Sequence, residues 1–234
     1  IAQWLGGQLA DSDSKEVGID GKVVSVAYAR QLVDELRGEG GLTLRTNFDP
    51  LAAVWTDRPS LPYNNKVEIQ PVELAGESAE KKLALIRKAL RGLHTDGMLM
   101  SALDDVAWTL NLRGRDVHCN PVFLSYLLIA PERATLFIDR RKLTPEVERY
   151  LSSVGVGVEE YAAVGKGLKD YFSYNILMDP KETGEVMPGY VDKHVKVVYA
   201  DSPVPAMKAV KTDAEIKGFK AAMLRDGVAM VKFL

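Results

Sequence analysis

The sequence predicts an α/β fold in which helices flank a mixed β-sheet. Short runs rich in β-branched and aromatic residues alternate along the 234-residue chain with segments whose apolar residues have helical spacing. Clusters of Gly, Pro and Asn separate these segments and mark turns. Hydrophobic residues make up 47% of the chain, which is enough to build a core between a sheet and the helices that cover it.

A first module is predicted over residues 1–63, where helix and strand alternate. The predicted elements are a helix at residues 1–9, a strand at 22–28, a helix at 29–38, a strand at 42–46 and a helix that starts at 49–50. The glycines after residue 37 are typical of a helix end, and Pro50 is typical of a first helical turn.

Residues 57–65 form the strongest candidate linker, because two prolines and two asparagines interrupt regular structure there. We expect a second module at 64–205. Its helices are predicted at 78–93, 104–110, 145–151 and 161–172, and its strands at 97–101, 122–129, 135–138, 155–159, 175–178 and 195–199. A second hinge is expected at 202–205, before a last amphipathic helix over 213–234.

The stretch from Asp104 to Tyr126 carries the most specific signal in the chain. Its first half has the apolar spacing of a short helix. Its second half is a charged loop that ends at Asn120–Pro121, a pair that favours a turn before the next strand. Neither burial nor a generic turn requires the run Leu-Asn-Leu-Arg-Gly at 110–114 in the middle of this stretch.

This stretch resembles the non-catalytic amino-terminal half of the aminopeptidase P (Xaa-Pro aminopeptidase) family. Residues 144–147 and 213–220 also match that family's pattern, whereas His118-Cys119 stands where an aromatic residue is common. The resemblance implies a creatinase/prolidase amino-terminal-domain-like fold that lacks the pita-bread catalytic domain. Residues 1–63 would end a first such domain, 64–205 would form a second, and 206–234 would be a linker and the first helix of the absent catalytic domain.

The same resemblance implies a metallo-aminopeptidase parent that removes the first residue of peptides whose second residue is proline. The parent would hold two metal ions, usually manganese, in its missing domain, and it would work as a homodimer. This chain would then be an inactive fragment that supplies scaffold, cleft wall and subunit contact. A prolidase, a creatinase or a non-enzymatic histone- or peptide-binding relative are the alternative parents.

Six residues of the stretch are candidates for a substrate cleft or a domain interface. They are Arg113, Arg115, Asp116, His118, Asn120 and Tyr126. Two guanidinium groups in the run Arg113–Asp116 could bind an anion, and the alternative is an internal Arg–Asp clasp that holds the loop. Asn120 can likewise be a simple turn residue, because asparagine bonds its own backbone in turns.

Composition argues against several other functions. A net charge of −2 gives no basic surface for nucleic acid, and no run approaches the roughly 20 apolar residues that span a bilayer. The three histidines lack metal-ligand spacing. The lone Cys119 cannot form an internal disulfide, which suits a cytoplasmic location. Because Cys119 follows His118 directly, the two side chains are not expected to form a catalytic pair.

The last predicted helix stops at Leu234 with an apolar face that nothing in the chain covers. We therefore expect the chain to be a fragment that self-associates through its ends, with Met223, Met230 and Phe233 among the contacts.

Overall fold

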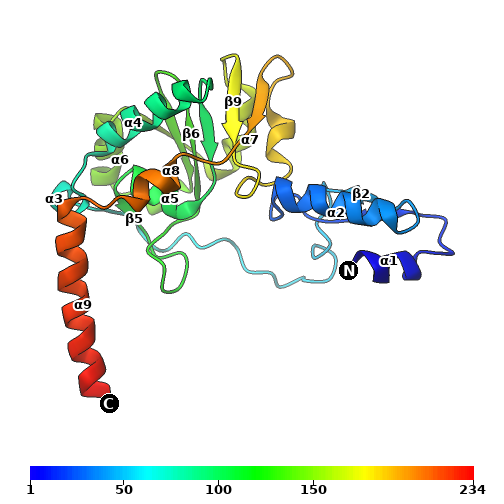
Figure 1. The fold of residues 1–234 in the computed structure, drawn as a ribbon, viewed down its shortest axis with the longest axis horizontal. Coiled ribbons are helices and arrows are strands. Elements are labelled where there is room, and N and C mark those ends of the chain that lie inside the picture. Colours follow the sequence, from blue (N-terminus) through cyan, green and yellow to red (C-terminus); the bar gives the residue numbers. More distant parts are fainter.

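The computed structural model describes all residues from 1 to 234 and centres on a six-stranded mixed sheet (Figure 1). The strand order is β10-β9-β4-β6-β7-β8. The strands are β4 (Met98–Met100), β6 (Ser125–Ile129), β7 (Ala134–Ile138), β8 (Val156–Glu159), β9 (Asn175–Met178) and β10 (Lys196–Tyr199). β4, β9 and β10 are parallel, β6 is antiparallel to β4 and β7, and β7 is parallel to β8. The predicted mixed sheet flanked by helices is confirmed.

Helices cover both faces of the sheet. One face carries α4 (Ala79–Gly92), α5 (Leu103–Thr109), α6 (Pro145–Ser153) and α8 (Val204–Ala209), and the other carries η2 (Tyr161–Ala163), α7 (Val164–Lys169) and η3 (Met187–Tyr190). Successive residues of β4 divide between the faces: Met98 and Met100 join a core of 23 buried residues and Leu99 joins a core of 10. The four inner strands β9, β4, β6 and β7 are therefore largely buried on both sides, which explains their apolar runs.

Capping residues define the helix starts. The Ser78 hydroxyl accepts a hydrogen bond from the backbone N–H of Lys81 and begins α4, and Thr144 does the same for α6 through the N–H of Val147. Pro145 occupies the first turn of α6. Both predicted helices are confirmed, because their signals are local in sequence.

The first module holds two helices and two short parallel strands. These are α1 (Ala2–Gln8), β1 (Glu16–Gly18), α2 (Val26–Gly38) and β2 (Thr43–Arg45), around a small core of Ala2, Leu32, Leu36 and Leu42. The predicted strand at 22–28 is wrong, because residues 22–24 form a turn and Ser25 caps α2. The predicted helix start at 49–50 is also wrong, since residues 50–54 form only turns.

Backbone hydrogen bonds join the first module to the turn after β9. The N–H groups of Val26 and Ala27, at the start of α2, donate to the carbonyls of Thr183 and Pro180 at 2.9 and 2.8 Å. Arg30 adds a cation–π contact, with its guanidinium 4.0 Å from the centre of the Tyr199 ring. The residues that resemble a strand in sequence thus bond to a loop more than 150 positions away.

Short elements complete the chain, and three predicted ranges elsewhere need correction. They include β3 (Glu68–Ile69), which pairs with β5 (Leu112–Arg113), together with α3 (Val72–Ala75) and the turn η1 (Arg140–Lys142). The predicted strand at 122–129 begins only at Ser125, and the predicted helix at 161–172 is η2 followed by α7. The predicted hinge at 202–205 is in fact the start of α8, because proline fits a first helical turn.

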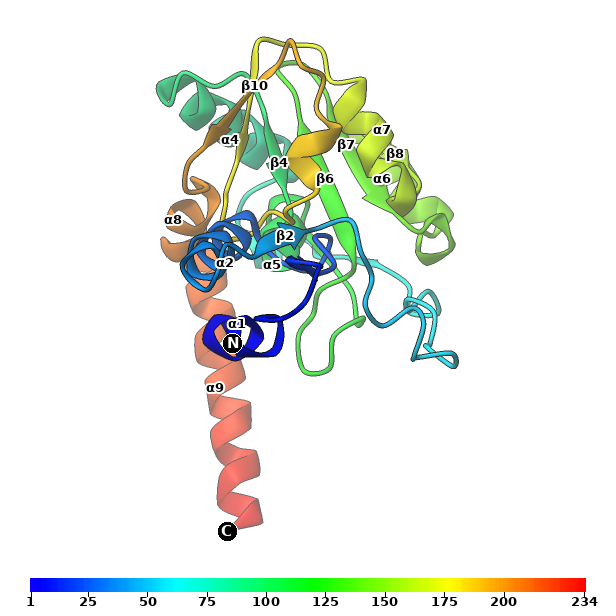
Figure 2. The ribbon, with the colours of Figure 1, turned by 90° about the vertical axis from the view of Figure 1, so that its right-hand side faces the viewer.

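The last helix, α9 (Asp213–Phe233), projects away from the body of the molecule (Figures 1 and 2). Thr212 and Glu215 form a reciprocal capping box at its start, and every residue from 216 to 234 is exposed. No helix in the structure combines the length and the apolar character that a membrane crossing requires.

Candidate functional site

The candidate loop, residues 113–121, hangs below the sheet on the side to which α9 projects (Figures 1 and 2). It follows β5, lies before the residues that lead into β6, and borders a hollow of about 450 Å³. The hollow is lined by Glu68, Arg113, Gly114, Arg115, Val117, His118, Cys119, Asn120 and Pro121. Five of the six predicted site residues therefore belong to one loop, and four of them line its hollow.

Backbone contacts give the loop a hairpin shape. The N–H of Gly114 donates to the carbonyl of Pro121, and the N–H of Asp116 donates to that of Val122. Gly114 packs so closely on Phe123 that an added Cβ would lie 2.7 Å from the phenylalanine Cβ. Cys119 adopts a left-handed φ of 58° at the tip. The loop can therefore present its tip residues in one arrangement.

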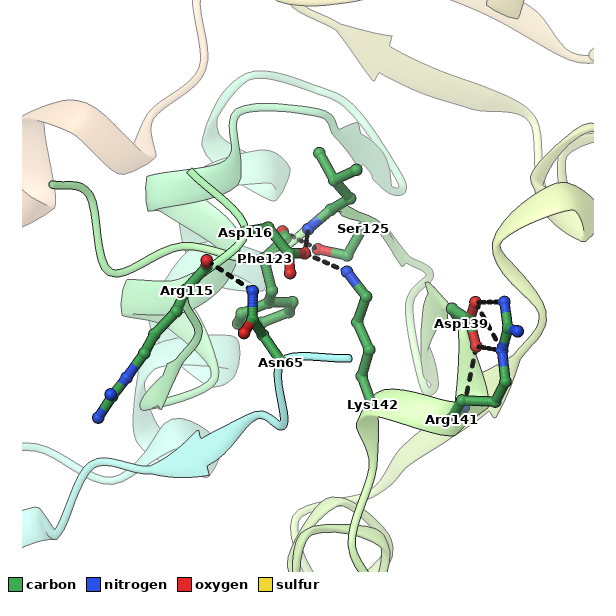
Figure 3. A network of polar contacts seen from close by, with 9 residues as sticks. Asn65, Arg115, Asp116, Phe123, Ser125, Asp139, Arg141 and Lys142 are labelled. Carbon is green, nitrogen blue, oxygen red and sulfur yellow. Dashed lines mark hydrogen bonds and ion pairs between the residues drawn. The ribbon is translucent and has the colours of Figure 1, made fainter. Parts of the chain in front are cut away.

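A buried ion pair fixes the base of the loop. Asp116 and Lys142 pair directly, and each side chain is 1% exposed (Figure 3). The same carboxylate oxygen of Asp116 accepts the backbone N–H of Leu124 at 2.7 Å, whereas its other oxygen has no partner. The expected clasp between Asp116 and an arginine of the loop is therefore wrong. Asp116 pairs instead with Lys142, which lies in the turn after β7.

The two arginines of the loop point to different surroundings. Arg113 is partly buried and donates to the carbonyls of Ala107 and Leu112 at 3.1 and 2.9 Å. Arg115 extends into solvent, 3.6 Å from Glu68, and its backbone carbonyl accepts the side-chain amide of Asn65 (Figure 3). Only Arg115 keeps an exposed guanidinium group beside the hollow, so an anion there would meet one such group.

The tip of the loop is exposed. His118, Cys119 and Asn120 all face solvent, and no side-chain hydrogen bond ties His118 to Cys119. Across residues 1–234, no group of three or more His, Cys, Asp or Glu side chains is placed to hold a metal ion. The tip can contact another molecule or domain, but its geometry supplies no catalytic pair.

Tyr126, the sixth candidate, lies in a separate place. Its ring stacks on that of Tyr161 with centroids 5.2 Å apart, and both line a cleft of about 1100 Å³ between the sheet domain and the first module. Burial, followed by the hydrogen bond to Tyr161, raises the pKa of Tyr126 far above its usual value, so its hydroxyl stays protonated. The hollow at the loop and this cleft share no lining residue.

Sequence reasoning missed a second buried cation behind the loop. Lys82, on α4, is 2% exposed and donates to the carbonyl of Trp108 at 2.9 Å and to the side chain of Asn111 at 2.7 Å. Burial lowers the pKa of Lys82 to about 8, and the Glu215 carboxylate opposes this shift. The signal was present, because Lys82 falls on the apolar stripe of α4.

Arg113 and Glu215 extend this group toward α9. Burial lowers the pKa of the Arg113 guanidinium, and the charge of Glu215 opposes the shift. Asn111, with a left-handed φ of 51°, donates its amide to the carbonyl of Glu77 at 2.8 Å. The run Leu-Asn-Leu-Arg-Gly therefore joins α4, α5 and the start of α9, and its two leucines are fully buried.

A third charged group holds α8 against α5. Lys208 pairs with Asp104 and Asp105, of which the Asp105 side chain is 3% exposed. Burial raises the pKa of Asp105, although Lys208 opposes the shift. Burial also disfavours the charge on Lys208, yet its bonds to the two aspartates outweigh this effect and raise its pKa. The segment that leads into α9 is thus anchored twice.

Comparison with known proteins agrees with this architecture. The family model described as "Creatinase/Prolidase N-terminal domain" matches residues 57–215. A "Probable Xaa-Pro aminopeptidase P" of Arthroderma gypseum is 33% identical over 242 residues, covering 99% of this chain and 37% of that protein. The protein of the same name from Leptosphaeria maculans is 33% identical over 243 residues, covering 100% and 40%.

A solved structure is similar over the whole chain. It is the X-prolyl aminopeptidase of Caenorhabditis elegans, described as a cytosolic enzyme with a di-nuclear active site, and it matches with a TM-score of 0.85 at 25% identity. The match covers 100% of this chain and 38% of that one. The chain spans about two fifths of the length of these relatives. It belongs to the creatinase/prolidase N-terminal domain family.

Proposed function

We propose that this chain is the non-catalytic amino-terminal part of an Xaa-Pro aminopeptidase. The observation that carries the proposal is its similarity along its whole length to proteins of that name, together with the TM-score of 0.85 to the Caenorhabditis elegans enzyme. The parent would hydrolyse the bond between the first residue of a peptide and a following proline. Proline-containing peptides are therefore the proposed substrates.

The chemistry would come from outside residues 1–234. Within residues 1–234, no group of three or more His, Cys, Asp or Glu side chains converges on one point, which supports this assignment. We place two metal ions, expected to be manganese, in the part of the parent that this chain does not cover. Residues 1–63 would be the carboxy-terminal part of a first creatinase-N-like domain, 64–205 would be a second, and 206–234 would be a linker and the first helix of the catalytic domain.

The loop at 113–121 would form a wall of the substrate cleft. Its exposed tip and the projecting α9 lie on the same side of the molecule, and the buried Asp116–Lys142 pair gives the loop a fixed base. Arg115, His118 and Asn120 would face the cleft. Arg113 would belong to the domain interface, because its charge interacts with Glu215 at the start of α9.

We also propose a homodimeric, cytoplasmic parent. The resemblance to the aminopeptidase P family supports the homodimer, and the description of the Caenorhabditis elegans enzyme as cytosolic supports the location. The chain would contribute scaffold and subunit contacts to that assembly.

A paired peptidase assay tests the proposal. The 234-residue chain, and a longer protein that carries the segment its relatives have beyond the matched part, are each given Arg-Pro-Pro and Arg-Ala-Ala peptides with Mn²⁺. We expect release of arginine from Arg-Pro-Pro by the longer protein only, abolished by a chelator. Chelator-sensitive release of arginine by the 234-residue chain itself would refute the proposal. Failure of the longer protein to cleave Arg-Pro-Pro would also refute it.

A further inference from the structure

A cleft separates the sheet domain from the first module, and nothing in the proposed reaction uses it. Its volume is about 1100 Å³, at the upper end of the range of roughly 300–1,000 Å³ that is usual for ligand pockets. One wall carries Tyr126, Tyr161 and Tyr190, and the facing wall is formed by residues 20–23 and 58–61. The cleft is therefore large enough for several residues of an extended peptide.

The tyrosine wall comes from three elements of the sheet domain. Tyr126 precedes the middle of β6, Tyr161 begins η2 and Tyr190 ends η3. The first two rings stack at an interplanar angle of 26°, and the ring of Tyr190 packs against Gly165, where an added Cβ would lie 3.2 Å from it. Aromatic faces with hydroxyl groups at their edges suit proline rings and peptide carbonyls, as in grooves that bind polyproline II segments.

The charges around the cleft favour an anionic ligand. Five cations and three aspartates line it, and two of the cations, Arg58 and Lys166, are paired with Asp49 and Asp170. The ammonium groups of the other three have no carboxylate within ion-pair distance; these are Lys22, Lys169 and Lys193. The remaining two lining aspartates accept backbone N–H groups of their own turns at 2.9 Å. With Asp170 counted, five cations stand against four aspartates, which leaves a small net positive charge around the cleft.

We propose that this tyrosine cleft binds an extended, proline-containing peptide segment that carries a carboxylate. Tyr126 and Tyr161 would pack on proline rings, and Lys169 with Lys193 would attract the carboxylate. The inference rests on the proposed function in one respect, since it assigns to the substrate class a second binding region that receives residues downstream of the scissile bond. Nothing in the cleft is expected to react.

The test is calorimetric titration of the 234-residue chain with N-acetyl Gly-Pro-Pro-Gly-Pro-Glu, which an aminopeptidase cannot trim. We expect saturable binding with a Kd below about 1 mM, weakened at least about fivefold when the prolines are alanines and about threefold when both carboxylates are amides. The variants Tyr161→Ala and Lys169→Glu should each weaken binding at least about fivefold, since one removes the stacking face and the other reverses a charge.

Matched controls lie outside the cleft. Tyr174→Ala removes a tyrosine that is 86% exposed, and Lys196→Glu reverses an exposed charge on β10. Both should bind the peptide within about twofold of the wild type, and thermal unfolding of all four variants reports whether they fold. If Tyr161→Ala fails to fold, Lys169→Glu still tests whether the peptide binds in the cleft, because Lys169 is exposed.

Three results would overturn the inference: no saturable binding up to about 5 mM, equal affinity for the alanine peptide, or unchanged binding by both cleft variants. Loss of binding as the protein concentration rises would also overturn it, because a second copy of the chain would then be the occupant. The paired peptidase assay is independent of these results. Absence of peptide binding to the cleft would therefore not refute the proposed peptidase function.

Discussion

Polar and charged residues within one short stretch of this chain have opposite roles. Asp116 is buried with Lys142 at the base of the loop, whereas Arg115, His118 and Asn120 are open to solvent a few positions away. A buried pair gains its attraction only against the cost of removing both charges from water. Its value to the molecule is therefore the fixed shape of the loop rather than a large net stabilisation.

Removing one partner of this pair should be strongly destabilising. Asp116→Ala leaves the Lys142 ammonium buried without a counter-charge, so we expect the free energy of unfolding to fall by about 3–5 kcal/mol. The double variant Asp116→Leu with Lys142→Met should lose much less. Urea unfolding measures both, with Arg141→Ala as a control whose exposed pair with Asp139 should be worth about 1 kcal/mol or less. A loss below about 1 kcal/mol for Asp116→Ala would refute the buried pair.

Lys82 should make stability depend on alkaline pH. Its pKa falls from 10.5 to about 8 on folding, so between these values the unfolded chain binds more protons than the folded one. Stability should therefore rise by about 2–3 kcal/mol as pH increases from about 8 to about 10.5, and the cost of the buried charge is fully present below about 8. Lys82→Met should remove this rise, because methionine has no proton to lose.

The difference between wild type and Lys82→Met isolates this residue from the other groups that titrate in the same range. Lys88→Met, on the exposed side of α4, is the control and should keep the wild-type rise. Parallel pH profiles for wild type and Lys82→Met in urea unfolding would contradict a lowered pKa.

Elements with local signals were predictable from sequence, and elements set by distant partners were not. α4 follows from the Ser78 cap and its apolar stripe, and α6 from Thr144 and Pro145. The β-branched residues around Ser25 also predicted a strand, yet the backbones of Val24 and Val26 bond instead to Glu185 and Thr183 in the turn after β9. That turn is too far away in sequence for any local rule to find it.

The candidate site was predictable to a similar degree. The sequence indicates a polar, charged loop that ends at Asn120–Pro121, because this pair favours a turn and a strand follows. It does not indicate that Lys142, 26 positions later, would hold Asp116, nor that Tyr161 would stack on Tyr126. Such pairs depend on how β6, β7 and η2 pack together, which composition and spacing do not specify.

The start of α9 is held by a close contact that a single methyl group should disturb. Gly76 has a φ of +75°, and an added Cβ would lie 2.2 Å from the hydroxyl oxygen of Thr212, which caps α9. Gly76→Ala should therefore release the cap and let α9 take many directions. Gly92→Ala is the matched control, since nothing lies within 4 Å of its Cβ position.

Spin labels measure that direction. The single Cys119 on the loop tip and a cysteine introduced by Met230→Cys report the distance between the loop and the end of α9. Electron double resonance should give a narrow distance distribution for the parent and for Gly92→Ala, and a clearly broader one for Gly76→Ala. Distance distributions of equal width in all three proteins would show that Gly76 does not fix the direction of α9.

At the scale of the whole molecule, α9 stands out because its apolar residues are exposed. Ile216, Phe219, Met223, Leu224 and Val231 are each more than 40% exposed, and the helix leaves the body without a partner (Figure 2). Exposed apolar patches larger than a few hundred Å² generally mark contact surfaces. In the proposed parent this surface would pack within the larger enzyme.

The isolated chain should therefore self-associate. Light scattering after gel filtration should give a mass above the 25.8 kDa of one chain, and the triple variant Met223→Glu, Met230→Glu and Phe233→Glu should return it to that mass. Tyr174→Glu, at an exposed position outside α9, should leave the association unchanged. A monomeric wild type at all concentrations would contradict a role for α9 in contacts.

The central claim is that residues 1–234 shape a substrate cleft without supplying its chemistry. Its most direct test is steady-state kinetics of His118→Ala and Asn120→Ala in the longer protein, with Glu132→Ala on the distant β6–β7 turn as control. We predict that both loop variants raise KM for Arg-Pro-Pro about three- to tenfold while kcat stays within about twofold, the pattern of binding lost equally in the ground state and the transition state. A fall in kcat of about a hundredfold at constant KM, or kinetics equal to the control, would contradict the claim.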